Sequence, residues 1–227
     1  MNLSKKTGNI AGANFSTMHF DDYLNIIPEQ KSGEEAEASA CYEAEDLKEA
    51  EVYYQVVRDR LLDVNYWHQV AGIVSAVFQL VDANGEEVLE RAGKGNYIRI
   101  DIPGPGSKEG SGYDWVFIEM FIEIATENKE SAGFRVRPTR NPKGSNSIAH
   151  FYSAAATSSF IVTRYEKKIS VRIVDRNLHP NDDTHSLTDE FRHTALAISA
   201  IGGFSKIQWK RLAEGLLKKN GEQFNEP

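Results

Sequence analysis

Two neighbouring stretches of the chain alternate apolar and polar residues, the pattern of β-strands that bury one face. In the first stretch, isoleucines occupy every second position: Ile98, Ile100 and Ile102. A Pro/Gly-rich loop beginning at Pro103 ends this strand, because proline has no amide to donate to a sheet. The core-side positions of the second stretch are Val116, Ile118, Met120, Ile122 and Ile124. Together the two stretches predict an antiparallel hairpin.

Four further segments carry strand patterns. Residues 75–81 read as a strand that ends at an Asn-Gly turn, and residues 134–137 as a short strand stopped by a proline. Residues 157–165 and 168–175 form a second predicted hairpin, since only a Glu-Lys pair separates two strand-like runs. Strands joined by short turns favour antiparallel pairing throughout.

Helical patterns lie on both sides of these strands. Residues 45–62 place apolar side chains near one stripe, with acidic residues in the first turn. A second helix is predicted to begin near Ser186 and to end at Gly202-Gly203, and a third to begin at a Ser205 cap. The acidic residues between Glu29 and Glu51 are interpreted as a solvated linker that leads into the first helix.

These elements predict an α+β fold. We expect a mostly antiparallel, curved sheet or small barrel from about Ile73 to Asp175, flanked by an N-terminal helix and two C-terminal helices. The predicted organisation is a flexible acidic N-terminal segment (1–44), one α+β domain (45–220) and a frayed tail (221–227).

Composition and charge exclude several classes of protein. The 227 residues carry a net charge of −7, which argues against general nucleic-acid binding because phosphate neutralisation needs a basic face. No apolar run approaches the roughly 20 residues of a membrane helix, so we expect a soluble cytoplasmic protein without membrane contact. The single Cys41 excludes an intrachain disulfide and a cysteine-based zinc site.

The chain lacks the common catalytic signatures: a His-Glu-x-x-His pair, a Gly-x-Ser-x-Gly elbow and a Walker loop. His185, Asp189 and His193 have the spacing of one helical face, but a solvated polar face is the favoured interpretation. The glycines between Gly104 and Gly112 form a poor anion site, because prolines remove amides and a strand follows. No cofactor or metal ion is therefore predicted.

The first hairpin carries the candidate binding residues. Tyr and Trp bring contact area to recognition sites, and charged side chains bring directed hydrogen bonds. The predicted contact residues are Arg99, Asp101, Tyr113, Asp114 and Trp115. Structural roles are the alternative: a loop cap for Asp114, a core position for Trp115 and a cross-strand ion pair for Arg99.

The stretches 97–106 and 112–116, together with Gly203–Lys210, resemble an uncharacterised family of bacterial proteins. The resemblance covers about the last two-thirds of the chain. It implies a bacterial origin and carries no activity to transfer.

Three functions remain open at this point. The leading prediction is a non-catalytic binding or assembly module that contacts a protein partner through the 103–115 loop and nearby aromatic residues. The second is a helix-grip-like carrier, in which the sheet encloses an apolar small molecule and the helix from Ser186 closes the cavity. The third is a hydrolase-type enzyme that uses His68 or His150 with Asp101 or Asp114.

Overall fold

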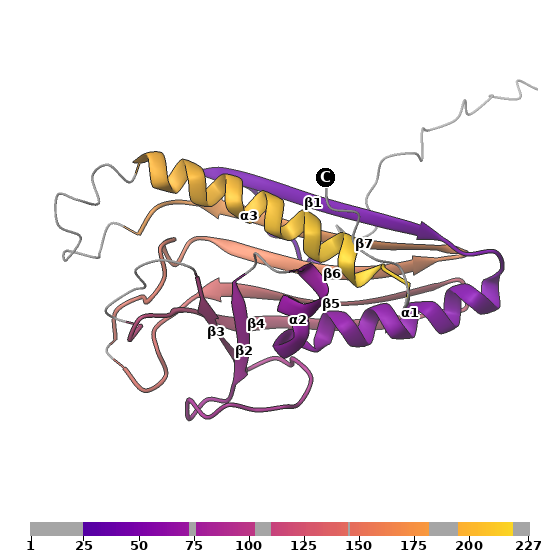
Figure 1. The fold of residues 1–227 in the computed structure, drawn as a ribbon, viewed down its shortest axis with the longest axis horizontal. Helices are drawn as coiled ribbons and strands as arrows, with labels where there is room; N and C mark the ends of the chain where they lie inside the picture. The colour runs from indigo at the N-terminus through magenta and orange to yellow at the C-terminus, as the bar shows by residue number, and fades with distance from the viewer. Residues whose placement is uncertain (1–24, 73–75, 103–109, 145, 182–194, 220–227) are drawn as a thin grey trace, which may run out of the picture.

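The computed structural model describes residues 25–72, 76–102, 110–144, 146–181 and 195–219. Within these residues, seven strands form a single antiparallel sheet in the order β1-β7-β6-β5-β4-β3-β2 (Figure 1). The strands are β1 (Glu34–Glu43), β2 (Val77–Val81), β3 (Tyr97–Asp101), β4 (Asp114–Ala125), β5 (Lys129–Pro138), β6 (Thr157–Tyr165) and β7 (Lys168–Leu178). The helices are α1 (Leu47–Leu62), α2 (Trp67–Ala71) and α3 (Ala195–Leu216).

The predicted α+β class is confirmed. The strands pair antiparallel with their neighbours, and the β3–β4 and β6–β7 pairs are the two hairpins expected from the sequence. The sheet is open rather than a closed barrel, because β1 and β2 are its two edges. Asp46 caps the N-terminus of α1: its carboxylate accepts a hydrogen bond from the Glu49 amide (2.8 Å), and this cap fixes the start of the predicted helix.

The acidic stretch that was interpreted as a solvated linker contains a strand. Residues 34–43 form β1, which pairs with β7 along the edge of the sheet. Ala36 and Ala38 are buried while Glu35 and Glu37 are exposed, so the two-residue period of a strand is present in small residues. Glu37 also pairs with Arg172 of β7 (3.0 Å), and charges of this kind protect an edge strand from pairing with other chains.

The C-terminal part of the chain does not form two helices separated at Gly202-Gly203, as the sequence predicted. α3 is continuous from Ala195 to Leu216 and passes through Gly202-Gly203, where the sequence predicted an end. Glycine weakens a helix interior by only about 1 kcal/mol, an amount that packing can offset. The predicted start near Ser186 lies outside the described residues. The third helix is instead α2, which is short and lies in the Trp67 region.

The regular alternation predicted for β4 is interrupted. A β-bulge between Ile118 and Met120 shifts the register against β5 and reverses which face the later side chains occupy. Phe121 therefore packs against the core, whereas Ile124 is 39% exposed. The unbroken alternation predicted for residues 116–124 holds only as far as the bulge.

The helices occupy the opening between the two sheet edges. α3 contacts β1 and β7 at one edge, α2 contacts β2 at the other, and α2 and α3 contact each other (Figure 1). Gly215 of α3 allows this close approach, because a Cβ there would lie 2.0 Å from the carbonyl oxygen of Val70. The concave face of the sheet is thus covered by helices.

An aromatic cluster lies beneath these helices. The ring of Trp67 lies 4.8 Å from that of Phe160, 5.3 Å from Phe78 and 6.0 Å from Phe134. Its indole N–H donates to the Leu61 carbonyl (3.0 Å), so the polar atom of this buried side chain is satisfied. The cluster ties α2 to the central strands.

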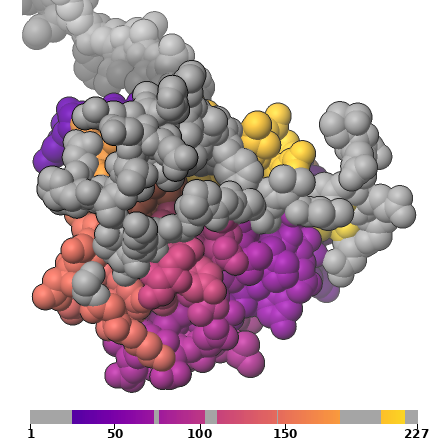
Figure 2. Space-filling model, turned by 60° about the vertical axis from the view of Figure 1, so that its left-hand side comes forward, coloured from indigo at the N-terminus to yellow at the C-terminus, as the bar shows by residue number. Residues whose placement is uncertain are grey.

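The loop after β5 lies against the β2–β3 connection. Lys143 Nζ is 2.8 Å from Glu86 Oε1, and the lysine stem lies close to Gly85. In Figure 2 the magenta surface of the β3 region adjoins the salmon surface of the segment around this loop. This end of the molecule therefore brings β2, β3 and the loop after β5 together.

Candidate functional site

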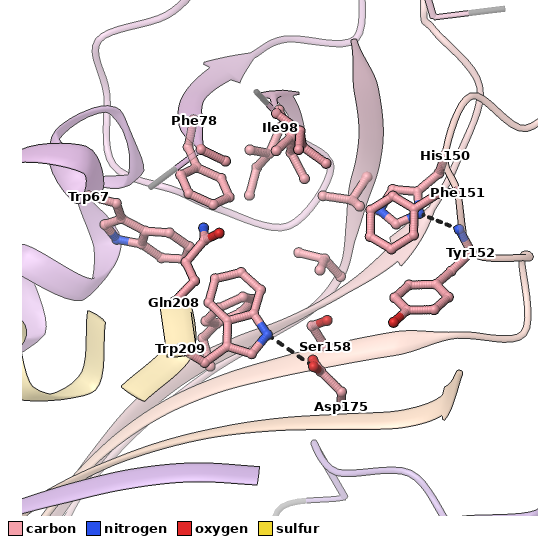
Figure 3. Close-up of a pocket in the computed structure, with 16 residues that line it drawn as sticks. Trp67, Phe78, Ile98, His150, Phe151, Tyr152, Ser158, Asp175, Gln208 and Trp209 are labelled. Carbon is pink, nitrogen blue, oxygen red and sulfur yellow. Dashed lines mark hydrogen bonds between the residues drawn. The ribbon is translucent and has the colours of Figure 1, made fainter. Parts of the chain in front are cut away.

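A cavity of about 90 Å³ lies between the concave face of the sheet and the helices α2 and α3 (Figure 3). Most of its wall is apolar and comes from α2, from strands β2 to β6 and from Trp209 of α3. Its aliphatic and aromatic lining includes Trp67, Phe78, Ile98, Ile100, Val136 and Phe160. The alternation predicted for Ile98, Ile100 and Ile102 is therefore what builds one wall of the cavity.

One side of the cavity is polar. Asp175 of β7 lines it together with Ser158 of β6 and Tyr152, and the side chain of Trp209 lies beside Asp175 and Ser158 (Figure 3). Asp175 is only 2% exposed. The Trp209 indole N–H donates to its Oδ2 (3.0 Å), whereas Oδ1 is buried and accepts no hydrogen bond within the described part of the chain. The carboxyl group therefore joins α3 to the sheet and keeps one acceptor that no described residue engages.

Burial raises the pKa of Asp175 to about 6. The Ser158 hydroxyl beside the carboxylate opposes this rise without making a hydrogen bond to Oδ1, and the Trp209 indole and the nearby Arg176 guanidinium oppose it too, since each favours the ionised carboxylate. Near neutral pH the cavity thus contains a negative charge that has been removed from water. A buried, incompletely bonded carboxylate is a feature of functional sites.

The raised pKa gives a pH-dependence of stability with a definite sign. The folded pKa of about 6 exceeds the reference value of 3.8, so the folded protein binds this proton more tightly than the unfolded chain does. Relative to Asp175→Asn, wild-type stability should be highest below about pH 4 and fall by roughly 3 kcal/mol as the pH rises to about 6. Urea unfolding of both proteins across this range measures the difference. A difference that does not vary with pH would contradict the assignment.

His150 and Tyr152 are held in neutral forms beside the same cavity. Burial lowers the pKa of His150 to about 3. The Nδ1 atom of His150 accepts a hydrogen bond from the backbone amide of Tyr152 (2.9 Å). The pKa of Tyr152 is raised to about 12, mainly by burial and to a smaller extent by the negative charges of Asp175 and Glu34. These side chains therefore offer hydrogen bonds without adding charge to the cavity.

Arg99, Asp101 and Tyr113, three of the five predicted contact residues, lie at the surface end of the β3–β4 hairpin. Arg99 Nη2 is 2.7 Å from Glu87 Oε1, and its guanidinium lies over the Tyr113 ring, with Cζ 4.7 Å from the ring centre. Asp101 is exposed at the end of β3. The intervening residues 103–109 lie outside the described part of the chain.

The other two predicted contact residues are buried. Trp115 is 5% exposed, packs with Val81 and Ala149, and donates from its indole to the Gly110 carbonyl (3.1 Å). Burial raises the pKa of Asp114 to about 7, and the Phe151 backbone amide hydrogen-bonds to its carboxyl. Both side chains hold loops in place, which matches the structural alternative.

The residues proposed for a hydrolase give little geometric support to that function. The partner of Asp114 described above is a backbone amide, and the Nδ1 of His68 is buried without a hydrogen-bond partner among the described residues. The predicted His185-Asp189-His193 arrangement falls outside the described ranges. Within those ranges, no three His, Cys, Asp or Glu side chains are grouped as metal ligands.

Sequence reasoning missed Asp175 and Trp209 as members of a site. Asp175 follows Ile173 and Val174 at the end of an apolar run in β7, and a carboxylate there is the signal that was available. Trp209 lies in the segment after Ser205 that was predicted to form the last helix. The two residues are 34 positions apart in the sequence, so no pattern within either segment predicts their contact.

Comparison with known proteins supports the fold. No protein-family model and no curated protein matches the sequence. A hypothetical protein of Helicobacter pylori has a similar structure with a TM-score of 0.50 at 9% identity, covering 91% of this chain and 98% of that one. At such low identity this likeness shows the fold alone.

Two other solved structures are less similar. Protein Ms6760 of Mycobacterium smegmatis has a TM-score of 0.39 at 13% identity, covering 83% of this chain and 93% of that one. Ara h 8.0201 has a TM-score of 0.37 at 12% identity, covering 82% of this chain and all of the other.

Membrane insertion through a helix finds no support in the described residues. None of the helices there combines the length and the apolar character needed to cross a bilayer.

Proposed function

We propose that this protein binds an apolar small molecule in the cavity between the sheet and α3. The observation that carries the proposal is the apolar wall around Phe78, Ile98 and Trp209, closed on one side by a buried carboxyl group. Ligand sites are typically concave and mostly apolar, with a few polar groups that fix orientation. A curved sheet around a long helix supports this function, because the helix covers the concave face.

The size of the cavity limits the occupant. About 90 Å³ lies below the roughly 300–1,000 Å³ of sites for drug-sized ligands, and an apolar cavity of about 150 Å³ holds benzene. The cavity is smaller than one that holds benzene, so the occupant is the end of a molecule, a short branched chain, or a single ring that shifts the lining side chains as it enters. Toluene is a suitable probe.

Filling the cavity should abolish binding of this probe. Ile100 lines the cavity and is only partly buried, so Ile100→Trp adds a ring to the empty space with limited strain on the sheet. We expect the dissociation constant for toluene, measured by NMR titration, to rise at least tenfold. Ile124→Trp is the matched control, because Ile124 is exposed beyond the bulge and should leave binding unchanged. Equal affinities in all three proteins would refute the proposed site.

The predicted protein-contact surface stays a prediction with fewer residues. Trp115 and Asp114 serve internal packing, so the described part of that surface consists of Arg99, Asp101 and Tyr113. The ion pair between Arg99 and Glu87 already engages its charge. A carrier is favoured because its site combines a concave shape, an apolar lining and a hydrogen-bond acceptor that no described residue engages.

A further inference from the structure

One oxygen of Asp175 has no hydrogen-bond partner among the described residues, and it indicates the chemistry of the occupant. We infer that the ligand is an apolar molecule with one hydroxyl or amino group, and that Oδ1 of Asp175 accepts a hydrogen bond from this group. The inference rests on the proposed function and adds the recognition element. It follows from the arrangement of Asp175, Trp209 and Ser158 at the wall of an otherwise apolar cavity (Figure 3).

Leaving this oxygen unbonded is unfavourable. Buried polar atoms in folded proteins almost always have partners, and a buried acceptor without one carries its full desolvation cost. Trp209 engages Oδ2 (3.0 Å), while Oδ1 accepts no bond within the described residues. A ligand that brings a donor to Oδ1 therefore gains a hydrogen bond to a charged acceptor, whereas a ligand without a donor gains none.

The two sides of the cavity also set the orientation. Trp67, Phe78 and Ile98 form an apolar side, and Asp175 lies with Ser158 and Tyr152 on the other (Figure 3). A bound molecule thus places its ring or chain against the aromatic cluster and its donor toward β7. Neutral His150 on the polar side adds no competing positive charge to the carboxylate.

Phenol and toluene test this inference, because the two molecules differ mainly in a hydroxyl that replaces a methyl group. Dissociation constants are measured by NMR titration at about pH 8, where Asp175 is ionised and phenol is still neutral. Asp175→Asn retains an acceptor for Trp209 and replaces the free acceptor by an amide donor. We expect this change to weaken phenol binding at least tenfold and toluene binding less than twofold.

Asp59→Asn is the control, since the Asp59 side chain on α1 is 42% exposed and does not line the cavity, so the change should alter neither affinity. If wild type binds both probes and Asp175→Asn weakens them equally, the inference is wrong while the proposed function stands. If wild type binds neither probe, both fail. A crystal structure of wild type with phenol decides the same question without a variant: a phenol oxygen about 2.7 Å from Oδ1 supports the inference. A water molecule on Oδ1, with phenol bound elsewhere, overturns it.

Discussion

Trp67→Ala is expected to lower the free energy of unfolding by about 3–5 kcal/mol, the usual range for removing a fully buried large aromatic side chain. Trp67 is 1% exposed and touches Phe78, Phe134 and Phe160, so its removal leaves an empty space at the junction of α2 and three strands. The Leu61 carbonyl also loses its hydrogen-bond donor. Urea unfolding followed by far-UV circular dichroism measures the change.

Tyr66→Ala is the control for this substitution. Tyr66 precedes Trp67 and is 51% exposed, so its replacement should change stability by less than about 0.5 kcal/mol. Equal effects of the two substitutions would show that the aromatic cluster does not centre on Trp67. Since Trp67 also lines the cavity, a folded Trp67→Ala protein should contain a larger cavity.

Glu130→Ala is expected to destabilise the protein by about 3–5 kcal/mol, because it leaves a buried cation without its partner. Arg164 has a side chain that is 2% exposed, and its Nε lies 2.6 Å from Glu130 Oε2. Glu130 also accepts a hydrogen bond from Gln55 of α1 (3.0 Å), so the carboxylate connects the helix to the sheet. Chemical denaturation of the variant measures the loss.

Two comparisons isolate the effect of burial. Glu86→Ala breaks the exposed Lys143 pair and should cost no more than about 1 kcal/mol. Replacing Glu130 and Arg164 together by methionine should recover most of the stability lost in Glu130→Ala, because no unpaired charge remains. A double variant as unstable as the single one would show that the unpaired charge is not the cause.

Patterns of large apolar residues predicted the centre of this fold. The β3–β4 and β6–β7 hairpins follow from alternation and short turns, and α1 follows from its stripe and its acidic start. β1 escaped because its buried positions carry alanine, which is not a typical strand residue, between glutamates. Its position depends on pairing with β7, more than 120 residues away along the chain.

Elements that depend on tertiary contacts were harder to predict. Gly202-Gly203 is a strong local stop signal, yet α3 continues through it and packs against β1 and α2. The bulge in β4 leaves no mark in an alternating sequence, so the change of face at Phe121 was not foreseen.

The candidate site was predicted in part. Ile98, Ile100 and Ile102 were correctly assigned to a buried face, and this face lines the cavity. The expected contact residues were taken from the opposite face and from the end of the hairpin. Asp175 was read only as the end of a strand, because its significance depends on Trp209 and on the empty space beside it.

The most direct test of the account is a crystal structure of the protein soaked with toluene. We predict electron density for the ring inside the cavity, against Trp67, Phe78 and Ile98, with the sheet and α3 unchanged. Crystals that show toluene only at the outer surface, or a cavity filled by side chains, would contradict the proposal that this cavity is a binding site.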